Sequence, residues 1–168
     1  VMLTMIKEGK RVMKDPSNYD ARANIMWAAM VAQNNSTGVG RAQDWGTHHM
    51  DNEIGILYGA SHGAGLALLF PYWMEYDMKT QELFVKYATR VWGCQNDFEH
   101  PEVTAREGIQ RFRDFMTEIG MPATISELGG KAEDIPVMVE NMFFGAPNHG
   151  NFVKLTPEIA AEVYKMAL

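Results

Sequence analysis

Residues 42–76, AQDWGTHHMDNEIGILYGASHGAGLALLFPYWMEY, decide the fold class of this chain. Apolar residues at helical spacing run over 42–58, and the pattern stops near Gly59, a residue type that commonly ends helices. Ser61 is a favourable N-cap for a second helix that reaches about Tyr76, with a bend expected at Pro71. The stretch therefore predicts two helices joined by a short turn.

Helical patterns also fill the chain on both sides of this pair. Residues 21–33 are apolar almost all round, which is typical of a buried helix. Further helices are expected around residues 2–13, over 80–92, over 103–120, over Ile135–Phe143, and from Pro157 to the C-terminus with Thr156 as N-cap. The sequence shows no convincing strand and no repeat of fixed period. The predicted fold class is all-α.

The bulk properties indicate one ordinary globular domain over residues 1–168. Hydrophobic residues make up 46% of the chain, enough for a core without disulfides, and Cys94 is the single cysteine, which favours a reducing compartment such as the cytoplasm. The formal net charge of −6 argues against a nucleic-acid partner. No run of 18 apolar residues exists, so no membrane span is expected, and no signal peptide is found.

The first residue of the chain and the lack of a nucleotide-binding motif both bear on which parts of a protein this sequence covers. The sequence opens on Val1 and enters helical periodicity at once, so we expect a processed chain or a fragment without its N-terminal part. It contains neither a strand–GxGxxG–helix unit nor a P-loop. If the protein uses a nucleotide, the domain that holds it is expected outside this chain.

Histidines are the residues with the clearest potential for chemistry. Three of the five, His48, His49 and His62, fall within fifteen residues around the two central helices. Paired histidines on adjoining helices are a standard way to hold a first-row divalent metal. By spacing alone, however, surface histidines or hydrogen-bonded core histidines are the commoner explanation, and both interpretations stay open.

The surroundings of His62 favour the metal interpretation. His62 follows the N-cap Ser61, and the positive end of the helix dipole disfavours an imidazolium, so the ring stays neutral and able to ligate. Small residues follow it, Gly63, Ala64, Gly65 and Ala67, and leave room for a bulky ligand. Tight helix packing explains these small residues at least as well.

The preceding helix carries a polar stripe. Asp44, His48, Asn52 and Gly55 lie at positions i, i+4, i+8 and i+11 of that stripe, in a helix whose neighbours look buried. Buried polar groups need partners, and a metal site supplies them.

His49 competes with His48 for a role in metal binding. His49 and Glu53, at i and i+4, form either an alternative metal pair or an exposed hydrogen-bonded pair. Successive helix positions differ by about 100°, so His48 and His49 do not both face one metal from a regular helix. Periodicity does not choose between them, and a metal- or haem-holding bundle built on His49 and Glu53 stays a separate hypothesis.

Two motifs carry a resemblance to a known family. Residues 44–48 (DWGTH), followed by residues 61–67 (SHGAGLA) and Pro71, resemble the iron-containing (group III) alcohol dehydrogenases, in particular their NAD(P)H-dependent butanol dehydrogenase branch. Residues 19–27 and 87–92 are similar to that branch too. The resemblance covers essentially the whole chain, as the C-terminal helical domain of the dehydroquinate synthase-like fold. It implies that the N-terminal nucleotide-binding α/β domain is absent from this sequence.

The resemblance also implies a ligand set and a reaction. In this family one divalent metal, Fe²⁺ or Zn²⁺, is held by an Asp and three His, of which the last two correspond to His48 and His62. The other two belong to an upstream D-x-x-x-H segment that this chain lacks. The full enzyme would transfer a hydride between NAD(P) and a small alcohol or aldehyde. Family members are often dimers, so a homodimer is a candidate assembly.

One position departs from the family pattern. Many members have a further His, implicated in proton transfer, where this chain has Asn52, and an amide is no general base near neutral pH. That role then passes to water, to the cofactor ribose or to His49, or is dispensable. Trp45, Gly63 and His149 are candidates near substrate or cofactor, although a core aromatic is favoured for Trp45 and a surface loop residue for His149.

Two functions follow from these observations. The first is the catalytic C-terminal domain, which we expect to be inactive by itself and to bind metal poorly, because half of the ligands are absent. The second is a free-standing helical interaction module without catalysis, whose exposed apolar surface would meet a partner.

Overall fold

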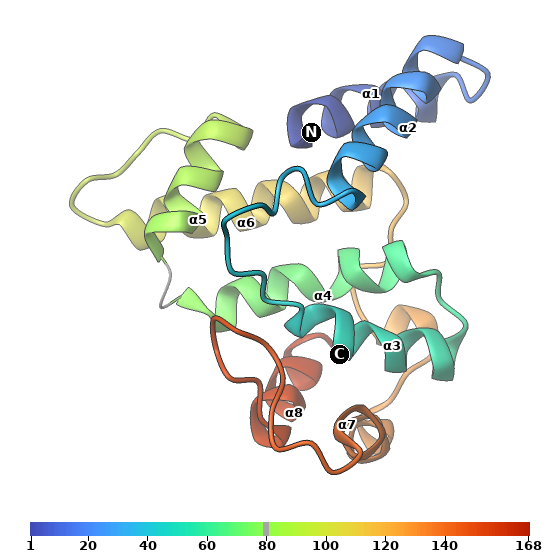
Figure 1. The fold of residues 1–168 in the computed structure, drawn as a ribbon, viewed down its shortest axis with the longest axis vertical. Helices are drawn as coiled ribbons and strands as arrows, with labels where there is room; N and C mark the ends of the chain where they lie inside the picture. The colour runs from blue at the N-terminus through green and yellow to red at the C-terminus, as the bar shows by residue number, and fades with distance from the viewer. Residues whose placement is uncertain (79–80) are drawn as a thin grey trace. The chain divides into compact units, whose positions relative to one another are not determined.

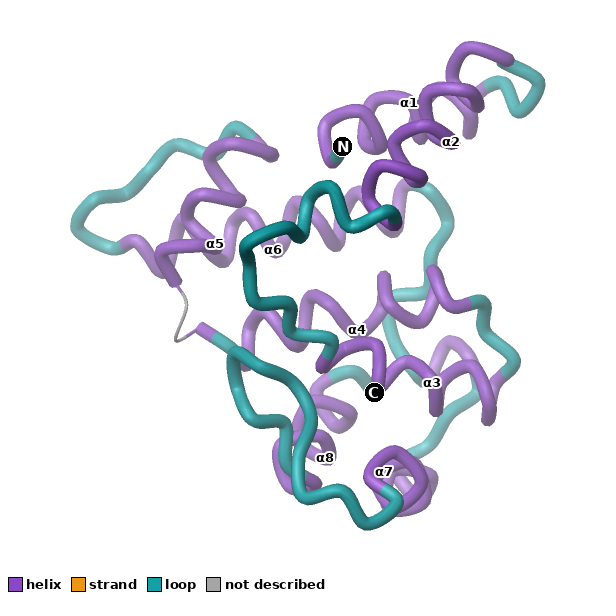
Figure 2. Tube along the Cα trace, viewed as in Figure 1, coloured by secondary structure: helices purple, strands orange, loops and turns teal. Residues whose placement is uncertain are grey.

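The computed structural model describes residues 1–78 and 81–168, which form two compact units, Val1–Ala42 and Gln43–Leu168. The all-α prediction is confirmed, because every regular element drawn in Figures 1 and 2 is a helix. Within the described ranges, the one extended pairing is an isolated β-bridge between His149 and Leu155. A single domain over 1–168 stays a prediction.

The first unit is a pair of helices, α1 (Met2–Lys14) and α2 (Tyr19–Gln33). The Asn18 side chain caps α2 by accepting a hydrogen bond from the backbone N–H of Ala21 at 2.9 Å. The prediction that residues 21–33 form a buried helix is wrong, since Met26 is 75% exposed and Trp27 is 68% exposed. Within Val1–Ala42, α2 packs against α1, and that unit offers its other faces no further helix.

The second unit contains the remaining elements. They are α3 (Gly46–Tyr58), α4 (His62–Tyr76), α5 (Gln81–Tyr87), the π-helical turn η2 (Ala88–Trp92), α6 (Pro101–Glu118), the short 3₁₀ turns η3 (Ser126–Leu128) and η4 (Ala132–Asp134), α7 (Ile135–Phe143) and α8 (Pro157–Met166). Helix α4 is central, because it packs against α3, α6 and α8, and α7 covers α3 and α8 (Figure 1).

Several helix ends follow from local signals. Helix α7 has the predicted bounds, and α8 begins at Pro157 after Thr156, whose hydroxyl accepts a hydrogen bond from the Ile159 N–H at 3.4 Å. Helix α4 continues through Pro71. The helix predicted over 80–92 ends in the π-helical turn η2, and its first residue, Thr80, lies outside the described residues.

Helix α3 begins later than predicted, at Gly46 and not at residue 42. Trp45 precedes it with a left-handed backbone, φ 63°, which a regular α-helix does not contain. Asp44 therefore lies outside the helix, and the predicted polar stripe of Asp44, His48, Asn52 and Gly55 is not one helical stripe.

The core of the second unit lies between α3, α4, α7 and α8. Met50, Ile54, Leu69 and Tyr164 are fully buried there. The Tyr164 hydroxyl donates a hydrogen bond to the Met50 carbonyl at 2.8 Å, which ties α8 to α3. This core holds the first turns of α3 and α4, where the candidate site lies. Across the described ranges, every helix is too short or too polar to cross a membrane.

Candidate metal centre and adjoining cavity

The chain reversal between α3 and α4 brings His48 and His62 together. His48 lies in the first turn of α3, His62 is the first residue of α4, and Gly59 ends α3 with a left-handed backbone, φ 67°. The two imidazole centroids are 5.3 Å apart and the ring planes are inclined by 59°. Rings at this separation can direct one nitrogen each at a common ion.

A buried carboxylate orients His62. Asp51 is 2% exposed, and its Oδ2 forms a short hydrogen bond with His62 Nδ1. Because a carboxylate accepts, Nδ1 carries the proton and Nε2 keeps its lone pair for a metal, the arrangement that metal-binding histidines usually have. Burial raises the pKa of Asp51, and the hydrogen bond to His62 opposes that shift.

The surroundings of His48 favour the neutral form of its imidazole. Burial lowers the pKa of His48, and His62 lowers it further, while Asp51 acts in the opposite direction. A neutral imidazole is the form that binds metals. Its Nδ1 is buried and has no hydrogen-bond partner, which is unusual for a buried polar atom and fits a ring whose polar partner is an ion.

The described residues do not form a complete metal site. Within residues 1–78 and 81–168, no group of three or more His, Cys, Asp or Glu side chains converges on one point as a metal site would. Protein sites for iron or zinc usually take at least three protein ligands. Donors from outside this chain are needed to complete a strong site around His48 and His62.

Gly65 allows Asp51 to reach His62. A Cβ built at Gly65 would overlap Asp51 Oδ1 and would lie 3.3 Å from Ile54 Cγ2, whereas a Cβ at Gly63 meets nothing within 4 Å. Close packing of α3 and α4 therefore accounts for Gly65, and room remains beside Gly63. Asp51 was not among the candidates predicted from the sequence. The signal lay in its spacing, three residues after His48, with Gly65 three residues after His62.

Replacing Gly65 with alanine should destabilise the chain by about 1–3 kcal/mol, because the added methyl group overpacks the Asp51 contact. The same change at Gly63 is the matched control, and it should be neutral or slightly stabilising because alanine favours helix. Urea unfolding of both variants measures the difference. Equal stability of the two variants would contradict the close contact between α3 and α4.

His49 and His149 form a second ring pair. Their centroids are 4.0 Å apart with planes inclined by 20°, a stacked arrangement, and His149 Nε2 lies 3.1 Å from the Met142 carbonyl oxygen. His149 lies in a loop segment, as predicted, and is half-buried there. Burial lowers the pKa of His49, followed by the effect of His149. Glu53, the predicted alternative partner of His49, instead accepts a hydrogen bond from Asn141 at 3.2 Å.

The two remaining candidates, Asn52 and Trp45, lie in different surroundings. Asn52 is exposed on α3. The rings of Trp45 and His48 are in T-shaped contact, with centroids 4.6 Å apart and planes inclined by 66°. The interpretation of Trp45 as a core aromatic is wrong, because the residue is 50% exposed.

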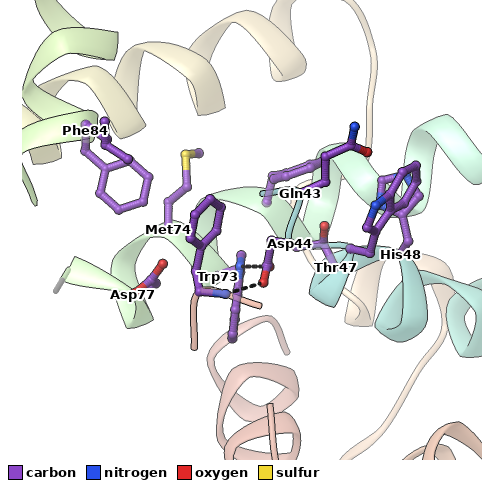
Figure 3. A pocket seen from close by; sticks show the side chains of 12 residues that line it. Gln43, Asp44, Thr47, His48, Trp73, Met74, Asp77 and Phe84 are labelled. Carbon is purple, nitrogen blue, oxygen red and sulfur yellow. Dashed lines mark hydrogen bonds between the residues drawn. The ribbon is translucent and has the colours of Figure 1, made fainter. Parts of the chain in front are cut away.

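Asp44 joins three segments next to His48. Its Oδ1 accepts backbone hydrogen bonds from Asn151 at 2.8 Å and Phe152 at 3.1 Å. Its Oδ2 accepts from the Gly46 N–H at 3.2 Å and from Trp73 Nε1 at 3.1 Å. Figure 3 shows the contact between Asp44 and Trp73. The polar partners of Asp44 are thus protein groups that fix the start of α3.

A cavity of about 380 Å³ adjoins the histidine pair and includes His48 and Trp45 in its wall. Figure 3 shows Phe84 and Met74 at one end of it and His48 at the other, with Trp73 and Asp44 between them. His48 therefore borders a partly open, largely apolar space.

Comparison with known proteins identifies relatives over the full length of the chain. The Fe-containing alcohol dehydrogenase family, C-terminal, matches residues 1–168. The NADH-dependent butanol dehydrogenase A of Clostridium acetobutylicum is 33% identical over 168 residues, 98% of this chain and 43% of that protein. The NADPH-dependent aldehyde reductase YqhD of Escherichia coli is 31% identical over 169 residues, 99% of this chain and 43% of that protein.

One solved structure also matches nearly the whole of this chain. The crystal structure of NADH-dependent butanol dehydrogenase A from Thermotoga maritima matches with a TM-score of 0.91 and 30% identity, over 98% of this chain and 43% of that one. The chain thus spans less than half the length of the relatives it matches.

Proposed function

The chain belongs to the Fe-containing alcohol dehydrogenase family, and from this we propose that it is the C-terminal metal-binding domain of an NAD(P)H-linked alcohol dehydrogenase or aldehyde reductase. The observation that carries the proposal is the pairing of His48 with His62, whose Nδ1 is bonded to the buried Asp51. Relatives named as butanol dehydrogenases and an aldehyde reductase support a small alcohol or aldehyde as substrate.

His48 and His62 would hold a divalent ion, Fe²⁺ or Zn²⁺, since imidazole suits both. The bound metal would supply Lewis-acid polarisation of the substrate oxygen, and the nicotinamide would carry the hydride. Asp51 keeps the His62 proton on Nδ1, and the Trp45 ring limits the orientations open to His48. Partial burial favours the neutral form of His48 by lowering its pKa.

Partners outside this chain complete the proposed enzyme. An upstream segment with an Asp and a His four residues later would supply the other two ligands, and an N-terminal nucleotide-binding domain would supply NAD(P)H. The exposed Met26 and Trp27 on α2 support a covering protein surface. We place the enzyme in the cytoplasm, where the buried thiol of Cys94 stays reduced, and expect a homodimer.

Metal content measured by mass spectrometry tests the proposal. The 168-residue chain alone should bind Fe²⁺ or Zn²⁺ weakly and transfer no hydride, because a two-ligand site is weak. A longer protein that includes the upstream ligands should hold a stoichiometric metal ion and lose it with His48→Ala or His62→Ala. His100→Ala, an exposed histidine elsewhere, is the control. A tightly held metal in the 168-residue chain, or retention by both site variants, would contradict the proposal.

A non-catalytic interaction module is the second candidate, favoured by the same exposed side chains on α2. The genomic reading frame separates the two. A frame that encodes an upstream D-x-x-x-H segment and a nucleotide-binding domain supports the enzyme, and a native start at this boundary supports the module.

A further inference from the structure

We propose that Trp45 is a positioning residue for the metal ligand His48, and that the chain keeps a strained backbone at Trp45 in order to hold the indole against that imidazole. The inference rests on the proposed function, because Trp45 would act on the metal through His48. It adds that the start of α3 is arranged for the orientation of one ligand, at a cost in stability.

Trp45 has a backbone conformation that its residue type disfavours. Its φ of 63° and ψ of 0° lie in the left-handed region, where a Cβ crowds the backbone and glycine is favoured. The next residue is a glycine, Gly46, but for a different reason, since a Cβ there would lie 2.9 Å from Asp44 Oδ2. The left-handed position itself therefore carries a bulky side chain, which persists only because the surrounding structure holds it there.

Hydrogen bonds on both sides of Trp45 hold the left-handed turn. Asp44 Oδ2 accepts a hydrogen bond from the Gly46 N–H at 3.2 Å. The Trp45 carbonyl accepts from the N–H groups of His48 at 3.1 Å and His49 at 3.3 Å. A different backbone conformation at Trp45 would break the bonds that begin α3.

Burial does not explain why a tryptophan occupies this position. The residue is 50% exposed, whereas a tryptophan kept for core packing would be largely buried. Its ring instead makes the T-shaped contact with His48, with centroids 4.6 Å apart and planes inclined by 66°. Because the edge of one ring attracts the face of the other, this contact favours one orientation of the imidazole.

His48 depends on such a contact more than His62 does. Asp51 orients His62 through the hydrogen bond to Nδ1, which is how proteins usually fix a metal-binding histidine. Among the described residues, the buried Nδ1 of His48 has no hydrogen-bond partner. The ring of Trp45 therefore takes the place, for His48, of the carboxylate that orients His62.

Glycine and alanine at position 45 separate the backbone from the side chain. Both substitutions remove the indole, but only glycine tolerates the positive φ, so Trp45→Gly should unfold at a higher urea concentration than Trp45→Ala. Ala29→Gly is the matched control on an exposed position of α2. There the backbone is helical, and glycine should lower the urea midpoint.

Metal affinity in the longer protein that includes the upstream ligands tests the positioning role. Competition for Zn²⁺ against a chelator should show about tenfold weaker binding in Trp45→Gly and Trp45→Ala. Trp45→Phe keeps an aromatic ring and should stay within about threefold of the original affinity. Phe98→Ala is the control, because it removes an aromatic ring that is 89% exposed in the loop before α6, and it should leave the affinity unchanged.

NMR relaxation of the imidazole groups in the 168-residue chain measures the order of the rings without any metal. The order of the His48 ring should fall in Trp45→Gly and Trp45→Ala and should be kept in Trp45→Phe. His62 is the internal control, because its hydrogen bond to Asp51 does not involve Trp45, and its order should be the same in all variants.

Equal stability of Trp45→Gly and Trp45→Ala would overturn the proposed strain. Unchanged order of His48 without the indole, unchanged Zn²⁺ affinity, or an equal loss of affinity in Trp45→Phe and Trp45→Ala would overturn the positioning role. If Trp45→Ala does not fold, the comparison of Trp45→Gly with Trp45→Phe decides. The proposed function fails if the longer protein holds no metal at all, whereas this inference fails if metal binds equally well with and without an aromatic ring at position 45.

Discussion

Replacing Asp44 with alanine should lower the free energy of unfolding of the chain by about 3 kcal/mol. The change removes four hydrogen bonds to one carboxylate and leaves the Trp73 indole N–H and the Gly46 N–H without their acceptor. Hydrogen bonds to a charged group contribute more than neutral ones, while solvent can replace part of the loss at the exposed Asn151 and Phe152 amides. Urea unfolding followed by circular dichroism measures the loss.

Asp114→Ala is the matched control for Asp44→Ala. Asp114 is exposed on α6 and accepts a hydrogen bond from Gln110 at 2.8 Å, so its removal should change stability by less than about 0.5 kcal/mol. The Met74 methyl signal should also move in Asp44→Ala, because Trp73 loses its anchor in the shared wall. A stability loss no larger than that of the control would show that Asp44 does not organise the start of α3.

Asp51→Asn should lower metal affinity about 10- to 100-fold in a longer protein that includes the upstream ligands. Asparagine keeps the size of the side chain but has no charge, and its amide can donate to Nδ1, which would move the His62 proton to Nε2 and block the ligating lone pair. Competition against a chelator measures the affinity. Imidazole ¹⁵N NMR of the 168-residue chain measures the tautomer without any metal.

Glu53→Gln tests whether the effect is specific to Asp51. Glu53 is also buried on α3, at 4% exposure, but its hydrogen bond goes to Asn141 and not to a metal-binding candidate. That variant should keep both the His62 tautomer and the metal affinity. If Asp51→Asn behaves in the same way as Glu53→Gln, then Asp51 does not orient His62.

Local signals predicted a large part of the fold. Thr156 followed by Pro157 marks the start of α8, and the turn residues at 59–61 predict the reversal that brings His48 close to His62. These features depend on neighbours in the chain, which a sequence pattern records directly. The choice of His48 over His49 did not come from such local signals, because periodicity left both open and only the family resemblance selected His48.

Features that depend on distant segments were not predictable from the pattern. Periodicity does not tell which side of α3 meets α4, so it gave no role to Asp51 or Gly65. The left-handed backbone of Trp45 moved the start of α3, because Asp44 has partners in a distant loop. A uniformly apolar pattern also does not tell a buried helix from an exposed one, as Trp27 on α2 shows.

The contacts of Asp44 bear on the order in which the site is assembled during translation. Asp44 leaves the ribosome more than a hundred residues before its partners Asn151 and Phe152, which are 107 and 108 positions further along the chain. Helices α3 and α4 can form early from local interactions, but the loop that closes over Asp44 is made more than a hundred residues later. The histidine pair is therefore expected to form first, and its surroundings to become rigid only after the 151–152 loop has emerged.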